Sequence, residues 1–557
     1  MQKLISPTSP FALIAALLFF MAFWNWGYDG ITFSDDVSYL TLGHQFWHDI
    51  PFQENDLFNY RWGTYLLPGL ITYLFGFNDH LASLPSLFAY MLTVVLIWKI
   101  LPEYLAKNVF VVFFCTSVFL LHFLPKVYPD SLLVFWTALI PASAVYRHKQ
   151  PFIAGLIMST AFFFGLCTKE TIILLAPLPL LLFIADARHN RPTSFYRYFV
   201  LFAIVFILGY LGYFYVQFGD PFFRLKSIET GHYVSPYSFY DKGWAKTLER
   251  LTFSPILTFI ERTFWIWIVL AVPGLVRAFK HDKDLHLVFA LSSLCLLIGF
   301  WFMTTSLSFY NPLHLNPRHL IILAPVLSVN IALEAKRWTS NFFWNRFGAL
   351  WIGFGGIVAL GLLDWKLAAF YFSFAAVLLL VPSKWKTPCL AVLLFFPVLA
   401  SVAYHKELKN YGHFKSVFNK TLSTCNADAP LISHDFVVKS GEVLVGEYNS
   451  HLPLYSVQEL TKKPAIDGLP QKFTILVYSY YNHAFPEEGS FVKEVTAFAN
   501  HYHYDKTKIY QDKWINIVQY NLKADLTTFQ NHREVVMGFR SDSDHLRHTA
   551  TPAPDRY

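Results

Sequence analysis

Charged side chains are scarce in this chain of 557 residues. Only 15% of the residues are Asp, Glu, Lys or Arg, whereas 55% are hydrophobic and 19% are aromatic. A soluble protein carries about a quarter charged residues. The mean hydropathy is +0.38, and apolar runs of membrane length recur from residue 11 to about residue 403. The composition excludes an ordinary soluble protein and indicates a polytopic membrane protein.

Cysteines and short catalytic motifs are also few. Of the five cysteines, four lie in hydrophobic runs and only Cys425 lies in the polar C-terminal part, so a disulfide within that part is excluded. No Walker-type loop, Cys/His metal spacing or Gly-x-Ser-x-Gly elbow occurs. The sequence therefore gives no support to an ATP-driven or nucleotide-sugar mechanism.

The basic residues follow the topology of a membrane protein rather than that of a nucleic-acid-binding protein. The net charge is +7, but most Lys and Arg residues fall in short loops on one side of the membrane, as the positive-inside rule requires. With the N-terminus inside, an odd number of spans places the C-terminal domain outside. We expect about thirteen transmembrane helices, at residues 10–27, 80–99, 108–124, 131–146, 152–168, 171–186, 198–216, 263–279, 286–303, 318–335, 346–363, 366–382 and 387–404.

The fold class predicted is thus a polytopic α-helical membrane protein with a soluble α/β domain on the outer face. Residues 1–404 form the membrane domain, and residues 405–557 form the outer domain. Runs at 429–434, 472–478 and 514–520 have the residue types of strands, and residues 487–502 have the spacing of a helix. The polar tail after about residue 541 is expected to be disordered. The chain ends without an endoplasmic-reticulum retrieval signal, which favours a bacterial inner membrane with a periplasmic C-terminal domain.

Two adjacent carboxylates, Asp35 and Asp36, follow the first apolar run in an outer loop. A carboxylate is costly to keep ionised beside hydrocarbon, so a pair at this place indicates chemistry. We interpret Asp35 as a candidate general base and Asp36 as a helper that orients a substrate or a metal. The alternative is that Asp36 only caps a helix. The pair could hold one divalent ion, although no ligand spacing demands it.

Further charges fall on the same outer face. Arg61 lies between aromatic residues, a setting that suits a phosphate and a sugar ring, or else an interfacial belt with one snorkelling cation. The pair Lys169 and Glu170 splits a long apolar region, as an anion site or as a tight ionic turn. Asp130 opens a predicted helix, where capping is the alternative to function. Arg318, followed by His319, would hold an anionic head group or would snorkel to the interface.

The order of these features resembles the GT-C superfamily of membrane glycosyltransferases, within it the protein O-mannosyltransferase and aminoarabinose-transferase-like group. The first-loop motif of that family is similar to Asp35-Asp36-Val-Ser-Tyr39. The next motif resembles the segment from Trp62 to Tyr65, although the family's Pro-Pro is absent. The family's later motifs match Asp130, Thr168-Lys169-Glu170 and the segment from Arg318 to Pro325, where His319 replaces a Tyr.

The resemblance implies transfer of a sugar from a polyprenyl-phosphate donor to an acceptor on the outer face, with inversion at the anomeric carbon. Asp35 would take the proton of the acceptor hydroxyl, and Asp36 would assist. The leaving phosphate would be neutralised by Arg61, Lys169 and Arg318. The acceptor is a glycolipid, a polysaccharide or a protein, and the other substrate-binding candidates are Tyr39, Tyr65, Asp130, Glu170 and His319.

Two alternatives come from other functional classes. A transporter or flippase for a lipid-linked or anionic substrate would need ionisable residues along a path through the bilayer, whereas the charges here cluster at the outer end. A noncatalytic envelope-assembly protein would use the outer domain for docking and would tolerate Asp35→Asn.

Overall fold

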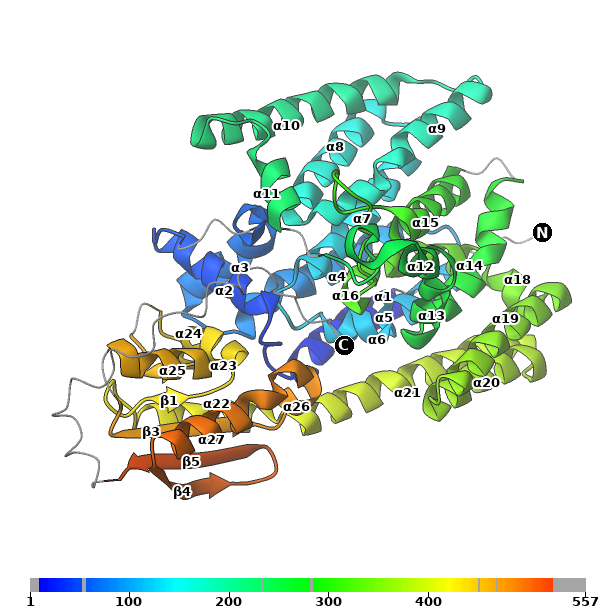
Figure 1. Cartoon of the computed structure of the whole chain (residues 1–557). Coiled ribbons are helices and arrows are strands. Elements are labelled where there is room, and N and C mark those ends of the chain that lie inside the picture. The colour runs from blue at the N-terminus through cyan, green and yellow to red at the C-terminus, as the bar shows by residue number, and fades with distance from the viewer. Residues whose placement is uncertain are drawn as a thin grey trace. The chain divides into compact units, whose positions relative to one another are not determined.

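The computed structural model describes residues 10–52, 57–231, 234–280, 284–448, 451–466 and 469–523. The chain divides into two units. The first unit comprises residues 1–28 and 38–402, and the second comprises residues 29–37 and 403–557. Figure 1 shows the elements by label, and each unit is described by itself below. The tail after residue 541, expected to be disordered, lies outside the described residues.

The first unit is helical. Its N-terminal half contains α1 (Phe11–Trp26), most of α2 (Asp35–Trp47), η1 (Leu57–Tyr60), α3 (Trp62–Phe75), η2 (Leu81–Ser83), α4 (Leu84–Ile100), α5 (Tyr104–Cys115), α6 (Val118–His122), α7 (Pro129–Val145), α8 (Pro151–Thr168), η3 (Glu170–Leu175), α9 (Pro177–Arg188) and α10 (Ser194–Phe218). Its C-terminal half contains α11 (Phe223–Gly231), α12 (Phe239–Thr252), α13 (Ser254–Glu261), α14 (Phe264–Ala278), α15 (Asp284–Phe302), α16 (Pro317–Leu320), α17 (Leu323–Leu333), α18 (Ala335–Ser340), α19 (Phe342–Gly361), α20 (Trp365–Leu380) and most of α21 (Ser383–Lys409).

Several predicted membrane spans are broken in the structure. The span predicted at 108–124 divides into α5 and α6, the one at 171–186 begins as η3 before α9, and the one at 318–335 divides into α16 and α17. By length and composition, six described helices can cross a membrane, or seven if α13 and α14, which meet at 106°, count as one span. The count of thirteen spans stays a prediction.

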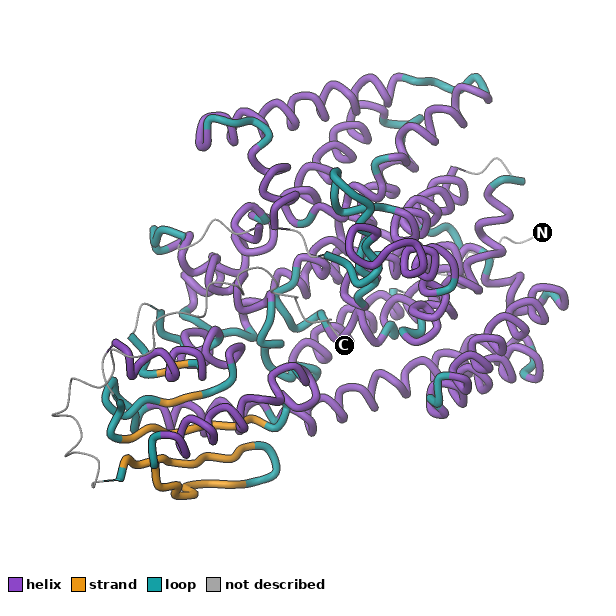
Figure 2. The backbone as a smooth tube through the Cα atoms, in the orientation of Figure 1, coloured by secondary structure: helices purple, strands orange, loops and turns teal. Residues whose placement is uncertain are grey.

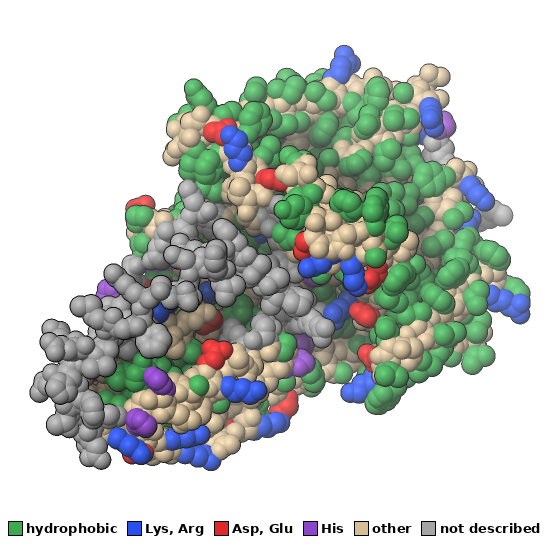
Figure 3. Space-filling model, viewed as in Figure 1, with side chains coloured by type: hydrophobic (Ala, Val, Ile, Leu, Met, Phe, Trp, Pro, Cys, Tyr) green, Lys and Arg blue, Asp and Glu red, His purple; other side chains and the backbone are tan. Residues whose placement is uncertain are grey.

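The surface of the first unit is apolar. Hydrophobic side chains cover much of it in the view of Figure 3. In the most apolar stretch of α10 only 6% is buried, although this helix packs along α8. An outward apolar surface on helices with satisfied backbone groups is the structure that hydrocarbon requires. This unit is a multi-pass membrane domain.

The second unit is a small α/β domain, whose strands are orange in Figure 2. Its sheet has the order β2-β1-β3-β5-β4. Strand β1 pairs in parallel with β2 and β3, while β5 pairs antiparallel with β3 and β4. Its elements are α22 (Tyr411–Leu422), β1 (Leu431–Ile432), α23 (Asp435–Lys439), α24 (Gly441–Val445), β2 (Leu454–Tyr455), α25 (Val457–Ile466), β3 (Lys472–Tyr478), α26 (Tyr481–Ala484), η4 (Pro486–Ser490), α27 (Phe491–His501), β4 (Tyr504–Gln511) and β5 (Ile515–Leu522).

The three strands predicted for this domain are confirmed as β1, β3 and β5, and the predicted helix is confirmed as α27. Two strands were missed. Strand β2 has only two residues, and β4 is exposed along nearly its whole length, so it has no alternation of buried and exposed side chains. A strand without that alternation gives no signal in the sequence.

Candidate active site

The carboxylate of Asp36 is enclosed by its own loop. It accepts hydrogen bonds from the Thr32 backbone N–H at 2.6 Å, the Thr32 hydroxyl at 2.7 Å and the Ser34 backbone N–H at 3.2 Å. The side chain is buried, and burial raises the pKa of Asp36, while these hydrogen bonds and the charge of Lys409 oppose the rise. Asp36 therefore fixes the turn that leads into α2, which is close to the capping role considered from the sequence.

Asp35 is the less enclosed member of the pair. It is half-buried in the first turn of α2, and the Ser34 hydroxyl lies 3.4 Å from its Oδ1 atom. Asp35 and Tyr39 are four residues apart on α2 and therefore lie on the same side of that helix. Of the two carboxylates, Asp35 is thus the more exposed, and its role as a general base stays a prediction.

Arg61 is held in a fixed position at the start of α3. Its Nε and Nη2 atoms donate to Glu170 Oε2 at 3.2 and 2.9 Å, and its Nη1 atom donates to the Tyr39 hydroxyl at 2.8 Å. Arg61 is 8% exposed, so it does not extend to the interface as a snorkelling cation would. The pattern of donors is that of an arginine fork aligned by a carboxylate.

Lys169 and Asp130 form a buried ion pair. Lys169 lies between α8 and η3, and its Nζ atom is 2.8 Å from each oxygen of Asp130 in the first turn of α7. Burial lowers the pKa of Lys169 to about 8, Asp130 raises it, and the charges of Arg318 and Arg61 lower it further. Arg61 and Arg318 are thus both close enough to Lys169 to act on its charge, while the phosphate-binding role of the three cations stays a prediction.

Arg318 and His319 lie on the short helix α16. The Arg318 guanidinium lies 5.5 Å from the centre of the Tyr128 ring, and its Nε donates to His319 Nε2 at 3.3 Å. His319 Nδ1 lies 3.0 Å from the carbonyl oxygen of His314. Burial, followed by the charges of Lys169 and Arg318, holds the pKa of His319 well below its usual range. His319 is therefore a neutral imidazole that orients Arg318.

The structure adds Arg224, which the sequence analysis missed. This buried residue of α11 donates through Nη2 to Glu170 Oε1 and through Nη1 to the Leu57 carbonyl at 2.9 Å. Glu170 thus joins Arg224 to Arg61. At the other end of α11, Glu229 accepts hydrogen bonds from Ser306 and Ser308. No local pattern marked Arg224, because its partner lies 54 positions away in the sequence.

Tyr65 was proposed to stack on a sugar ring, but in the structure its side chain is enclosed by other residues of the protein. It is fully buried, donates to the Asn59 carbonyl at 2.8 Å, and has the rings of Phe46 and Phe52 beside it. Tyr39, in contrast, contributes its hydroxyl to Arg61 and has its ring against Phe58. The role of Tyr65 in sugar binding stays a prediction.

A second charged cluster lies at the opposite ends of α7 and α8. Arg147 donates to both oxygens of Asp186 at 2.8 Å and to Asp284 at 2.8 Å, and Arg191 donates to Asp284 at 2.7 Å. His148 lies 3.3 Å from Asp186. Although His148, Asp186 and Asp284 are close enough to ligate an ion, both carboxylates already have guanidinium partners. This group is an ionic tie between helix ends.

Comparison with known proteins shows which family part of this chain resembles. Residues 63–213 match the family model of dolichyl-phosphate-mannose-protein mannosyltransferase, and this segment contains Asp130, Lys169 and Glu170. The fold is similar to the crystal structure of ArnT from Cupriavidus metallidurans bound to undecaprenyl phosphate, with a TM-score of 0.55 and 11% identity over 92% of this chain and 98% of that chain. The predicted resemblance to GT-C membrane glycosyltransferases is confirmed.

Two further findings complete the comparison. The apo structure of ArnT from Cupriavidus metallidurans matches with a TM-score of 0.49 and 12% identity over 82% of this chain and 87% of that chain. No curated protein sequence matches the chain at a significant level. Of the three predicted phosphate-binding cations, only Lys169 lies within the matched residues 63–213, whereas Arg61 and Arg318 lie outside them.

Proposed function

We propose that the protein is a glycosyltransferase that moves a hexosyl or pentosyl group from a polyprenyl-phosphate donor to an acceptor hydroxyl. The observation that carries the proposal is the outer cluster of buried charges. Three cations, Arg61, Lys169 and Arg224, pair with two carboxylates, Asp130 and Glu170, and the charge of Arg318 also acts on Lys169, so these residues together carry an excess of positive charge. Such an excess suits a leaving phosphate, whose charge grows in the transition state.

The reaction assigns a task to each group. The acceptor hydroxyl attacks C1 of the sugar, and Asp35 takes its proton as the new C–O bond forms. The bond from C1 to the phosphate oxygen breaks on the opposite side, so the configuration inverts. The phosphate keeps the electron pair of that bond, and Arg61, Lys169 and Arg318 stabilise it. The site of ArnT from Cupriavidus metallidurans, described as binding undecaprenyl phosphate, supports a polyprenyl-phosphate donor for this fold.

Asp36 has a supporting task in this proposal. Its hydrogen bonds to Thr32 and Ser34 fix the turn from which Asp35 projects. Tyr39 and Glu170 hold Arg61, Asp130 holds Lys169, and His319 orients Arg318. A sugar acceptor, whether glycolipid, polysaccharide or protein, would approach from the outer face of a bacterial inner membrane, with the N-terminus in the cytoplasm and the C-terminal domain in the periplasm.

The transporter alternative is disfavoured by the helices that connect the two charged clusters. Between Asp130 and Arg147 the chain has no charged residue, and residues 151–168 of α8 have none. The 17 residues of α7 rise by about 25 Å. An anionic substrate moving along these helices would find no ionisable partner over most of the bilayer thickness.

The test compares the envelope glycans of cells that carry the wild type, a deletion, Asp35→Asn or Asp49→Asn, by mass spectrometry. Asp49 is an exposed residue of the same outer loop region and is the matched control. We expect the deletion and Asp35→Asn to lose the same sugar and Asp49→Asn to keep it. Full function in Asp35→Asn would overturn the assignment of the base.

A second measurement separates the enzyme from the transporter. Purified protein in detergent, supplied with polyprenyl-phosphate sugars and envelope acceptors, should form product although no two compartments exist. A transporter would give no product under these conditions.

A further inference from the structure

The segment that carries the two carboxylates belongs structurally to the C-terminal unit. Residues 29–37 comprise the loop after α1 and the first turn of α2, yet they group with residues 403–557 rather than with the rest of those helices. All contacts described in this subsection are therefore contacts within the second unit. They give the C-terminal domain a role that the sequence did not reveal.

Phe33 anchors the segment in an aromatic cage. Its side chain is 1% exposed, and its backbone has φ of 60°, which is uncommon for a residue other than Gly. Five rings lie at centroid distances between 5.7 and 6.3 Å, mostly edge to face, and they belong to Tyr411, Phe414, Tyr478, Tyr480 and Tyr481. Aromatic pairs in such geometry stabilise a contact beyond the area that they bury.

The cage lies at a place where α/β sheets bind ligands. Tyr478 is the last residue of β3, and Tyr480 and Tyr481 come two and three residues later. The chain runs from β1 to β2 on one side and then to β3 on the other side of β1, so the connections change direction at this edge. Ligands of open α/β sheets bind at such a switch point, outside the carboxyl ends of the strands. Here the chain's own Phe33 occupies that position.

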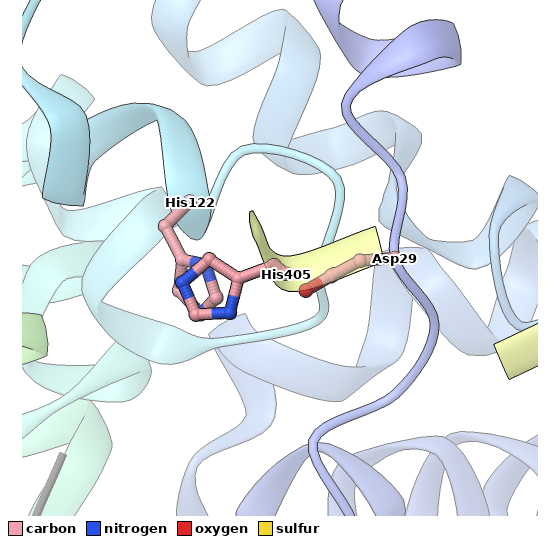
Figure 4. Close-up of side chains that lie close together, drawn as sticks. All are labelled: Asp29, His122 and His405. Atoms are coloured by element: carbon pink, nitrogen blue, oxygen red, sulfur yellow. The ribbon is translucent and has the colours of Figure 1, made fainter. Parts of the chain in front are cut away.

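Lys409 is the second anchor. It is the last residue of α21 and is 1% exposed. Its Nζ atom donates to the Ile31 carbonyl at 2.8 Å and lies 3.7 Å from Asp29 Oδ2. Figure 4 shows Asp29 directed from the segment toward α21, the helix that also carries His405. The charge of Lys409 also acts on Asp36 and lowers the pKa of its carboxyl.

Gly30 permits the close approach of the segment to α22. Its φ is +89°, and a Cβ atom at this position would lie 2.1 Å from Cγ of Tyr411. Any other residue would collide with that ring and would be strained in this backbone conformation. Gly30 and Phe33 thus both have positive φ angles. Ordering each residue of the segment also costs about 1–2 kcal/mol in entropy. The segment would therefore not keep this conformation without its contacts to the rest of the unit.

We propose that the C-terminal domain binds residues 29–37 as an internal ligand and thereby positions the carboxylates, with Phe33 and Lys409 as positioning residues. The role of the carboxylates rests on the proposed function. The binding of the segment does not, because it is carried by contacts within the second unit. Without the anchors, Asp35 would sample many positions, and a misplacement of about 1 Å can lower a rate by about 10²-fold.

The first test uses Phe33→Leu in the full-length protein, with Phe498→Leu as the matched control. Phe498 is a buried phenylalanine of the same unit that packs on the sheet core instead of the cage. We expect Phe33→Leu to lower kcat at least about tenfold, with little change in KM for the donor, whereas Phe498→Leu keeps kcat. Their thermal unfolding temperatures in detergent should fall by similar amounts.

The second test uses Lys409→Met and Lys409→Arg. The charge of Lys409 from α21 acts on Asp36, whose carboxylate accepts hydrogen bonds from Thr32 and Ser34 and is next to Asp35 in the chain. Removing the positive charge takes away an influence that lowers the pKa of Asp36, so an acid limb of the pH–rate profile that depends on ionised Asp36 should move to higher pH in Lys409→Met. Lys409→Arg keeps the positive charge and should restore the acid limb of the wild-type pH–rate profile. A role of Lys409 in packing alone would not predict this restoration.

Hydrogen exchange separates failure of this inference from failure of the proposed function. In the wild type the amides of Thr32, Ser34 and Val37 are hydrogen-bonded and should exchange slowly, whereas in Phe33→Leu they should exchange at least about tenfold faster. Slow exchange in a protein that transfers no sugar would refute only the function. The positioning role would be refuted if Phe33→Leu kept the wild-type kcat and the wild-type exchange rates, and if Lys409→Met kept the wild-type acid limb of the pH–rate profile.

Discussion

Replacement of Asp130 by Asn tests the electrostatic design of the outer cluster. The change preserves the shape of the side chain but removes the charge that compensates Lys169, whose Nζ lies 2.8 Å from both carboxylate oxygens. Both side chains are buried, with 8% and 1% exposed. Breaking a buried ion pair from one side costs about 3–5 kcal/mol, because the remaining charge is left without a partner.

The same change should alter the protonation of Lys169. Its pKa of about 8 lies below the ordinary value of 10.5 because burial outweighs the attraction of Asp130. Loss of a carboxylate at this distance lowers a neighbouring pKa by about one to three units. In Asp130→Asn, Lys169 would then be neutral at pH 7.5, and the leaving phosphate would lose one of its cations. We expect kcat/KM to fall by about 10²–10³-fold.

The pH dependence has a defined sign. In the proposed mechanism activity requires protonated Lys169, so the wild-type rate should decline as the pH rises through about 8, and this alkaline limb should move to lower pH in Asp130→Asn. Stability should change in the opposite sense. A lysine whose pKa is lowered on folding binds fewer protons in the folded state between pH 8 and 10.5, so stability rises with pH across that window.

The assay is steady-state transfer from a polyprenyl-phosphate sugar in detergent between pH 6 and 9, together with thermal unfolding. The double variant Asp130→Asn/Lys169→Met is the control. It should recover most of the lost stability because no buried charge is left unpaired, but it should recover no activity. The reasoning would be refuted if Asp130→Asn had the same alkaline limb of the pH–rate profile and the same unfolding temperature as the wild type.

Two further outcomes follow from the ion pairs. Arg224→Lys removes the fork that joins Glu170 to the Leu57 carbonyl, and we expect KM for the donor to rise about tenfold, as steady-state kinetics would show; unchanged kinetics would contradict a role of α11 in the site. Arg147→Met leaves Asp186 buried with one strong partner fewer, so it should cost about 3–5 kcal/mol of stability without changing kcat in the surviving folded protein. A lowered kcat at full stability would contradict the assignment of that cluster as a structural tie.

Much of the membrane domain could be predicted from the sequence, because apolar length and flanking polarity are local properties. Helices α7, α8, α10 and α15 coincide closely with predicted spans. Strands β3 and β5 were predicted from their β-branched and aromatic residues, whereas β4 was missed because its side chains are exposed on both faces. The breaks within other spans depend on tertiary packing, and no local pattern marks them.

The candidate site divides in the same way. The sequence itself determined the residue types: carboxylates and cations at the ends of apolar runs, where an unpaired charge would be costly. It could not determine which charges pair. Lys169 binds Asp130, Glu170 joins Arg61 to Arg224, and Arg224 comes from α11, a helix with no motif of its own.

The assignment of residues 29–37 to the C-terminal unit was likewise decided only by the tertiary structure. Phe33 and Gly30 have no periodicity or spacing that refers to residues near Tyr411 or Tyr478, because a local pattern records the preferences of neighbours in the chain and not long-range contacts. Burial of one aromatic ring among five others can fix a segment that its own backbone preferences disfavour. The sequence thus determined which carboxylates and cations lie beside the apolar runs, and the folded chain determined that Asp35 and Asp36 belong to the C-terminal unit.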